Sequence, residues 1–171
     1  MAPSKNFLAA LGLITFNFQN FEKEIEFLAW ALIGSDQEIG QIVTSQMSFR
    51  KLCDTLGSLI RYRTSDAELI SELDGLLDKA AKIEQERNTI VHSAWFWSMA
   101  HDPKGAITRL KITAKGDKGL KHQYQSVQVS DLSSIASSIK SVASEVMAFR
   151  IKAKDRGVID YPSSQIKSPA A

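Results

Sequence analysis

Apolar residues recur every three or four positions along most of the chain, which is the spacing of an amphipathic α-helix. The pattern predicts four helices in the first 97 residues and one near the end of the chain. Their expected ranges are residues 5–33, 36–45, 49–62, 66–97 and 132–153. Residues that favour helix ends stand at most of these boundaries: Ser4, Gly34, Ser48, the pair Ser65 and Glu68 in a capping-box spacing, and Ser130-Asp131.

Two stretches that alternate between apolar and polar residues interrupt the helical pattern, at 107–113 and 124–129. The residues between them include two glycines and several lysines, so the segment 107–129 is predicted to form a β-hairpin with a basic tip. The expected fold class is mainly α: a helical bundle of four to five helices with one appended β-hairpin. Residues 1–156 are predicted to form a single domain, and 157–171 a tail without a core of its own.

The most informative stretch is 84–97, which reads EQERNTIVHSAWFW. Helical spacing places Arg87 in the middle of an apolar face, where an unpaired charge would cost several kcal/mol. Asn88 and His92 are four residues apart and share one edge of that face. Arg87 and His92 are about 140° apart around the helix axis, so they do not stack on each other.

Two interpretations of this stretch remain open. In the structural one, Arg87 pairs with a carboxylate of a neighbouring helix, for which Glu22, Glu24 and Glu26 are candidates, and His92 is an interior histidine. In the functional one, a guanidinium and a titratable imidazole line a polar site cut into an apolar helix face.

The segment Arg87-Asn88-Thr89-Ile90-Val91-His92 resembles the R-(polar)-x-x-x-H signature of the HEPN superfamily, whose members are helical bundles and in many cases metal-independent ribonucleases. The resemblance covers the motif, the helix that carries it and the helical layout of residues 4–156. It implies that Arg87, Asn88 and His92 are catalytic. It also implies a homodimer in which two motif helices line one cleft.

The chemistry of these side chains suits RNA cleavage. An imidazole can take a proton from a ribose 2′-OH or give one to the leaving 5′-oxygen. A guanidinium can bind a phosphate and stabilise charge on the phosphorane, while Asn88 orients the imidazole or binds a phosphate oxygen. Such a site needs no metal or other cofactor and leaves a 2′,3′-cyclic phosphate.

The resemblance leaves two functions open. The first is a metal-independent endoribonuclease, acting as a toxin or phage-defence effector, with an antitoxin or nucleotidyltransferase as partner protein. The second is a non-enzymatic HEPN-like module for binding or dimerisation, in which the motif serves structure.

Charge is distributed unevenly along the chain, although the net charge is only +2. Residues 1–103 hold nine Lys and Arg against 14 Asp and Glu, and residues 104–156 hold eleven against four. The basic part either binds an anionic partner such as RNA or is attracted to the acidic part. The candidate contacts to an RNA backbone are Arg109, Lys111, Lys115, Lys118 and Lys121. Trp95 either stacks on a base or packs in the core or interface.

Composition narrows the remaining possibilities. Cys53 is the single cysteine, which rules out an intrachain disulfide or a Cys-rich metal site and favours a cytoplasmic location. No apolar run approaches the roughly 20 residues of a membrane span. Residues 7–18 lack the cleavage pattern of a signal peptide. Phosphate-binding glycine loops and the H-E-x-x-H zinc motif are absent, and His101 and His122 are expected at the surface.

Overall fold

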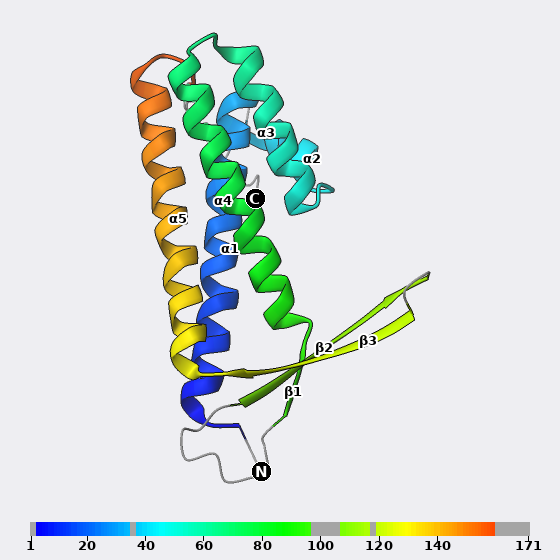
Figure 1. Cartoon of the computed structure of the whole chain (residues 1–171). Coiled ribbons are helices and arrows are strands. Elements are labelled where there is room, and N and C mark those ends of the chain that lie inside the picture. The colour runs from blue at the N-terminus through cyan, green and yellow to red at the C-terminus, as the bar shows by residue number, and fades with distance from the viewer. Residues whose placement is uncertain (1–2, 35–36, 97–106, 117–118, 160–171) are drawn as a thin grey trace, which may run out of the picture. The chain divides into compact units, whose positions relative to one another are not determined.

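The computed structural model describes residues 3–34, 37–96, 107–116 and 119–159. The fold is mainly helical with a β-hairpin, which confirms the predicted fold class (Figure 1). Its elements are α1 (Lys5–Ile33), α2 (Gln37–Thr44), α3 (Phe49–Arg63), α4 (Ala67–Val91), β1 (Ala94–Phe96), β2 (Ile107–Lys115), β3 (Gly119–Val127) and α5 (Val129–Asp155).

The chain divides into two compact units, and each is described by itself. The first unit comprises Met1–Asn20 and Lys82–Ser141, and the second comprises Phe21–Ala81 and Val142–Ala171. Because α1, α4 and α5 cross these boundaries, each of them contributes one segment to each unit.

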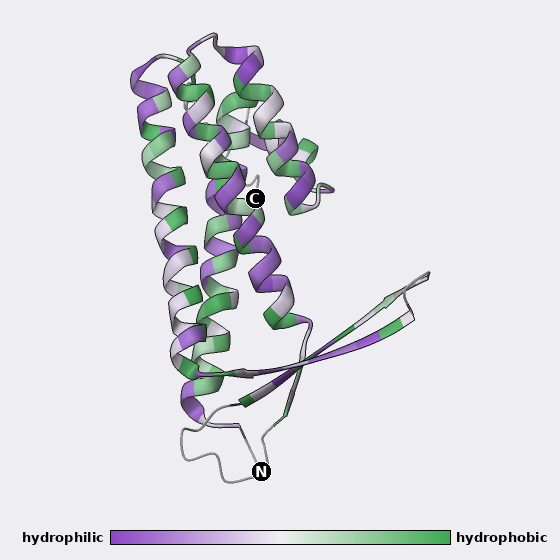
Figure 2. Ribbon diagram, in the orientation of Figure 1, coloured by the Kyte–Doolittle hydropathy of each residue, from purple (hydrophilic) through white to green (hydrophobic). Residues whose placement is uncertain are grey.

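The second unit consists of helices that pack their apolar sides together. Its fully buried side chains come from α1, α3, α4 and α5: Phe21, Ile25, Leu28, Leu32, Leu56, Ile60, Leu69, Leu73, Val146 and Phe149. In Figure 2 the helices of this unit carry green and purple residues around their circumference, as amphipathic helices do.

The end of α1 is capped by a side chain from α3. Gly34 has a φ of 70°, the left-handed conformation that favours glycine after a helix. Arg63 donates from Nε to the carbonyl oxygen of Leu32 at 2.6 Å and from Nη2 to that of Ile33. A Cβ at position 34 would lie 2.2 Å from Arg63 Nη2, so the glycine also makes room for this cap.

The short helix α2 is fixed to α1 by a buried hydrogen bond. Trp30 Nε1 donates to Thr44 Oγ1 at 2.8 Å, and Thr44 donates in turn to the carbonyl of Gly40 at 2.9 Å. Gly40 lies directly against the indole, since a Cβ there would be 2.8 Å from the ring of Trp30.

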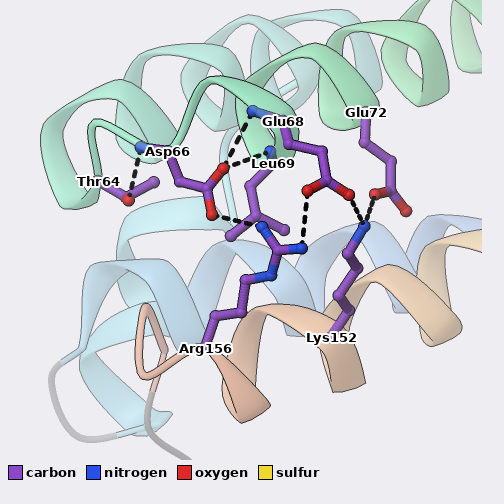
Figure 3. A network of polar contacts seen from close by, with 7 residues as sticks. All are labelled: Thr64, Asp66, Glu68, Leu69, Glu72, Lys152 and Arg156. Atoms are coloured by element: carbon purple, nitrogen blue, oxygen red, sulfur yellow. Dashed lines mark hydrogen bonds and ion pairs between the residues drawn. The ribbon is translucent and has the colours of Figure 1, made fainter.

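A network of ion pairs joins the start of α4 to the end of α5 (Figure 3). Lys152 donates to Glu68 at 2.8 Å and to Glu72 at 2.6 Å. Arg156 donates to Asp66 at 2.5 Å and to Glu68 at 2.8 Å. The hydrogen bond from Arg156 lowers the pKa of the Asp66 carboxyl, and the bonds from Lys152 and Arg156 lower the pKa of Glu68.

Helix starts agree with the predicted caps in two cases and differ in two. The predicted cap Ser130-Asp131 is wrong, because α5 begins at Val129 and both residues lie within its first turn. Ser4 accepts from the backbone N–H of Phe7, and Ser48 from that of Lys51. The predicted capping box of Ser65 and Glu68 is wrong, because Asp66 Oδ1 accepts the N–H groups of Glu68 and Leu69. An Asp carboxylate is both a good acceptor and a favourable charge at a helix N-terminus.

The first unit combines helix segments with a three-stranded antiparallel sheet in the order β1-β2-β3. The predicted hairpin is β2 and β3, with Leu110 opposite Tyr124. On the helical side Phe7, Ile14 and Phe18 of α1 are buried. Asn17 of α1 donates from Nδ2 to a carbonyl oxygen of α5 at 2.8 Å.

The prediction that α4 continues to residue 97 is wrong, because the helix ends at Val91 and residues 94–96 form β1. Three groups of the following segment satisfy the last carbonyls of the helix. The N–H of His92 donates to Asn88 at 3.1 Å, the hydroxyl of Ser93 to Thr89, and Nε1 of Trp95 to Ile90 at 3.2 Å. These bonds replace the next helical turn.

The predicted start of the tail at residue 157 also needs correction. The N–H of Gly157 donates to Lys154 at 2.8 Å and that of Val158 to Ala153 at 3.0 Å, which is a Schellman motif ending α5. Ile159 is buried, so the packed part of the chain extends at least to this residue. The rest of the predicted tail lies outside the described residues.

Candidate functional site

The three motif residues lie at the C-terminal end of α4, in the first unit. Arg87 and Asn88 belong to the last two turns of the helix and are half-buried. His92 is the first residue beyond the helix, and its imidazole is exposed. The interpretation of His92 as an interior histidine is therefore wrong.

Arg87 is held by an amide and an aromatic ring. Its Nη1 donates to Asn88 Oδ1 at 2.9 Å, and its guanidinium carbon lies 5.0 Å from the centre of the Phe18 ring. Such a cation–π contact stabilises a guanidinium by about 0.5–2 kcal/mol. Its Nε is buried and lacks a hydrogen-bond partner among the described residues.

In the structural interpretation, Arg87 pairs with Glu22, Glu24 or Glu26. Two of these three carboxylates are paired with other cations. Glu24 pairs with Arg150 at 3.0 Å, and Glu26 pairs with Lys23 at 2.6 Å. In the part of the chain that the structure describes, Arg87 forms no ion pair with a carboxylate. Among the described residues, the guanidinium thus has no carboxylate within ion-pair distance.

Phe18 is the partner that sequence reasoning missed. It belongs to the apolar side of α1 and is nearly 70 positions away from Arg87 in the sequence. Helical periodicity marks it only as a core residue. Nothing in a periodic pattern indicates which ring a distant cation will cover.

The hairpin reaches the motif through Lys111. Its Nζ lies 3.4 Å from Oγ1 of Thr89, which is a residue of the motif itself. Arg109 stands opposite Trp95 in the sheet register, and its guanidinium donates to Oε1 of Gln125. Two of the five cations predicted to contact RNA therefore lie on the part of the sheet next to α4.

The other predicted cations are placed differently. Lys121 is exposed on β3, opposite Thr113. Lys115 is the last residue of β2, and Lys118 lies outside the described residues.

Trp95 anchors the sheet to α1. Its ring meets that of Phe7 edge to face, with centroids 5.1 Å apart and an interplanar angle of 68°. Its Nε1 caps α4, and the side chain is half-buried. Both the ring face and the polar group are thus engaged in packing, which is one of the two roles considered for this residue.

The two units differ in net charge. The first holds ten Lys and Arg against five Asp and Glu, a net charge of +5, and the second holds eleven against fourteen, a net charge of −3. Of the eleven Lys and Arg in residues 104–156, seven belong to the unit that carries the motif and four to the second unit. A positive potential around the site would attract an anionic ligand.

Comparison with known proteins adds no relative: no family model, curated protein or solved structure matches the chain. No helix among the described residues is long and apolar enough to cross a membrane. Within the same residues, no three His, Cys, Asp or Glu side chains gather as the ligands of a metal ion would.

Proposed function

We propose that the chain is a metal-independent endoribonuclease in which Arg87 and His92 are the catalytic groups. The observation that carries the proposal is the state of Arg87, a half-buried guanidinium that is oriented by Asn88 and Phe18 and has no carboxylate partner in the described chain. An exposed imidazole ends the same helix. A cation kept free of a counter-ion is suited to bind phosphate.

The reaction follows from the two side chains. The ribose 2′-oxygen attacks the adjacent phosphorus, and the bond from phosphorus to the 5′-oxygen breaks. His92 takes the proton of the 2′-OH or supplies the proton of the leaving 5′-oxygen. Arg87 stabilises the negative charge on the phosphorane oxygens. The products are a 2′,3′-cyclic phosphate and a 5′-OH, and DNA is inert because it lacks the 2′-OH.

His92 lies just beyond α4, but its N–H still donates to Asn88, so its backbone follows the helical path by one further residue. Helical spacing then separates Arg87 and His92 by about 140° around the axis, which is too wide for a single phosphate. The proposal therefore includes a homodimer, in which Arg87 of one copy and His92 of the other act on the same phosphate. The contact of Lys111 with Thr89 places a further cation beside the motif, where it can bind a neighbouring phosphate of the RNA strand.

The test is RNA cleavage in the presence of EDTA, with a matched pair of histidine variants. His92→Ala should lower the cleavage rate by about 10²–10⁴-fold, because proton transfer is lost. His122→Ala removes an equally exposed imidazole from β3 and should cleave like the wild type. Products with a 3′-OH would overturn the proposal, as would an equal loss of cleavage rate in His92→Ala and His122→Ala.

A non-enzymatic binding module is the second candidate, and the same contacts of Arg87 favour it. A guanidinium that packs on Phe18 and binds Asn88 can serve the fold alone. A wild-type protein that binds RNA without cutting it, and whose binding is unchanged in His92→Ala, would support this second function.

A further inference from the structure

The first turns of α1 are apolar on two sides. One side is buried and includes Phe7, Ala10, Ile14 and Phe18. On the other side Leu8, Leu13 and Phe16 are 51%, 51% and 60% exposed, and Ala9 and Gly12 between them are also exposed. No charged residue occurs from position 6 to 21, and these turns are mostly green in Figure 2. We call the five exposed residues the α1 stripe.

The sheet of the same unit has a second uncovered apolar surface. Alternation along the strands and the register place Phe96, Ile112, Leu120 and Tyr124 on one side, which we call the sheet face. Their exposed fractions lie between 49% and 69%. Arg109, Lys111 and Lys121 occupy the opposite side. Antiparallel sheets normally pack their apolar side on a core. On this side Leu110 is buried, but the four residues of the sheet face are exposed.

The combined area indicates what covers these surfaces. Taking about 200 Å² for a whole large apolar side chain, the exposed fractions leave about 300 Å² on the α1 stripe and about 450 Å² on the sheet face. Each alone is no larger than the biggest patch of an ordinary monomer. Together they approach the roughly 800 Å² that each partner contributes to a stable protein interface.

The two surfaces also match in length and chemistry. Leu8 and Phe16 are eight residues apart, about 12 Å along a helix. Leu120 and Tyr124 are four residues apart, about 13 Å along a strand. Neither surface includes Lys, Arg, Asp or Glu, although the imidazole of His122 lies beside the sheet face, opposite Ile112. Neither surface therefore offers a permanent counter-charge to an ionic partner. RNA is disfavoured as occupant because most of these side chains are aliphatic and the cations lie on the other side of the sheet.

We infer that the occupant is a second copy of this chain, and that the sheet face of each copy covers the α1 stripe of the other. Figure 1 shows the connected ends of β2 and β3 extending away from the helical segments of the unit, as an exchanged arm would. This reciprocal contact obeys two-fold symmetry and uses both surfaces in both copies. The basic side of the sheet, which contacts α4 through Lys111 and α1 through Trp95, is not part of this contact. The contact does not depend on RNA cleavage.

The oligomeric state of three matched variants tests the inference. Light scattering at micromolar concentration should find a dimer for the wild type and for His92→Ala. Phe16→Glu and Leu120→Glu should each be monomeric, because each buries a carboxylate in an apolar contact. Ile42→Glu changes an apolar side chain on α2 of the second unit that is 72% exposed, more than Phe16 or Leu120, and this variant should remain dimeric. Circular dichroism verifies that every variant is folded.

Disulfide cross-linking tests whether the α1 stripe of one copy contacts the sheet face of the other. It does so without placing a charge in the contact. In a Cys53→Ser background, a copy with Phe16→Cys is mixed with a copy carrying Leu120→Cys. Oxidation should cross-link the two different copies. A monomeric wild type, efficient cross-linking of Phe16→Cys copies with each other, or a Leu120→Glu variant that stays dimeric but no longer binds RNA would overturn the inference.

Discussion

Two arginines in the two units are held in nearly the same way. The guanidinium of Arg87 lies 5.0 Å from the ring centre of Phe18, and that of Arg150 lies 5.5 Å from the ring centre of Phe27. In both, Nε is buried and has no hydrogen-bond partner in the described structure. Both therefore pay a desolvation cost at Nε and gain a similar cation–π contact.

The difference lies in the acceptor. Arg150 donates to the carboxylate of Glu24, whereas Arg87 donates to the neutral amide of Asn88. Three further cations differ in the same way, in whether their acceptor is charged or neutral. Lys152 and Arg156 bind carboxylates, while Lys111 of the first unit contacts a neutral hydroxyl. Arg150, Lys152 and Arg156 of the second unit are thus compensated by carboxylates. Arg87 and Lys111 of the first unit contact neutral acceptors.

The largest expected effect comes from removing each arginine in turn. Arg87→Ala should lower RNA cleavage by at least about 10²-fold, because charge on the phosphorane loses its stabilising donor. Its melting temperature should change little, since no carboxylate is left unpaired. Arg150→Ala should cleave normally, but it leaves Glu24 without its partner and should cost about 1–2 kcal/mol of unfolding free energy.

Cleavage rates and thermal melts of the two alanine variants, measured on the same preparations, provide the comparison. Loss of activity in Arg150→Ala at a temperature where it is folded would contradict the assignment of Arg150 to the fold. A strongly destabilised Arg87→Ala would assign that side chain to the fold as well.

A smaller effect is expected from the basic hairpin. Changing Lys115, Lys118 and Lys121 to Glu should weaken RNA binding and reduce the slope of log K against log salt by roughly 2, since each phosphate contact with a single strand contributes about 0.7. The matched control changes Lys23, Lys51 and Lys79 of the second unit to Glu and alters net charge equally. Titration of labelled RNA at several salt concentrations measures the binding constants of the hairpin variant and the control variant. Equal slopes for the two would show that the hairpin has another role.

The smallest effect concerns acid. Since the pKa values of Asp66 and Glu68 are lowered in the folded state, their pairing stabilises the protein above their ordinary values of 3.8 and 4.5. This stability is lost as the pH falls through the lowered values. Arg156→Met should therefore melt below the wild type at pH 7, and the gap should close below about pH 4.

Arg87→Gln provides the control for this titration, because the acceptor Asn88 does not ionise. Any difference in melting temperature between Arg87→Gln and the wild type should not close in the same pH window. Melting curves from pH 7 to pH 3 measure both gaps. A gap for Arg156→Met that stays constant with pH would show that the network contributes nothing through its charges.

The sequence predicts the helices of this fold well because their signals are local. The range of α1 agrees at both ends, and α3 differs by one residue, since periodicity and the caps at Ser4 and Ser48 lie within each segment. The end of α4 could not be predicted in the same way. Its last carbonyls are capped by Ser93 and Trp95, and β1 exists only because β2 pairs with it from beyond residue 106.

The candidate site is likewise predictable where its signals are local and unpredictable where they depend on distant parts of the chain. The motif residues Arg87, Asn88 and His92 are recognisable from their spacing, and the structure places them at one helix end. The exposure of His92 and the contact of Arg87 with Phe18 depend on where the helix stops and on what α1 presents to it. These features arise from contacts between distant segments, and the spacing of apolar residues along the sequence does not predict such contacts.

The buried indole of Trp30 makes it possible to follow the unfolding of each unit by tryptophan fluorescence. Trp30 reports on the second unit through its bond to Thr44, and Trp95 reports on the first through its contact with Phe7. With Trp97 and Trp95 replaced by Phe, the emission comes from Trp30 and follows the second unit. With Trp97 and Trp30 replaced, it comes from Trp95 and follows the first unit. Helices that run through both units can fray at one end while the other stays folded. Fluorescence from Trp95 alone would then register the opening of the segment that follows the motif.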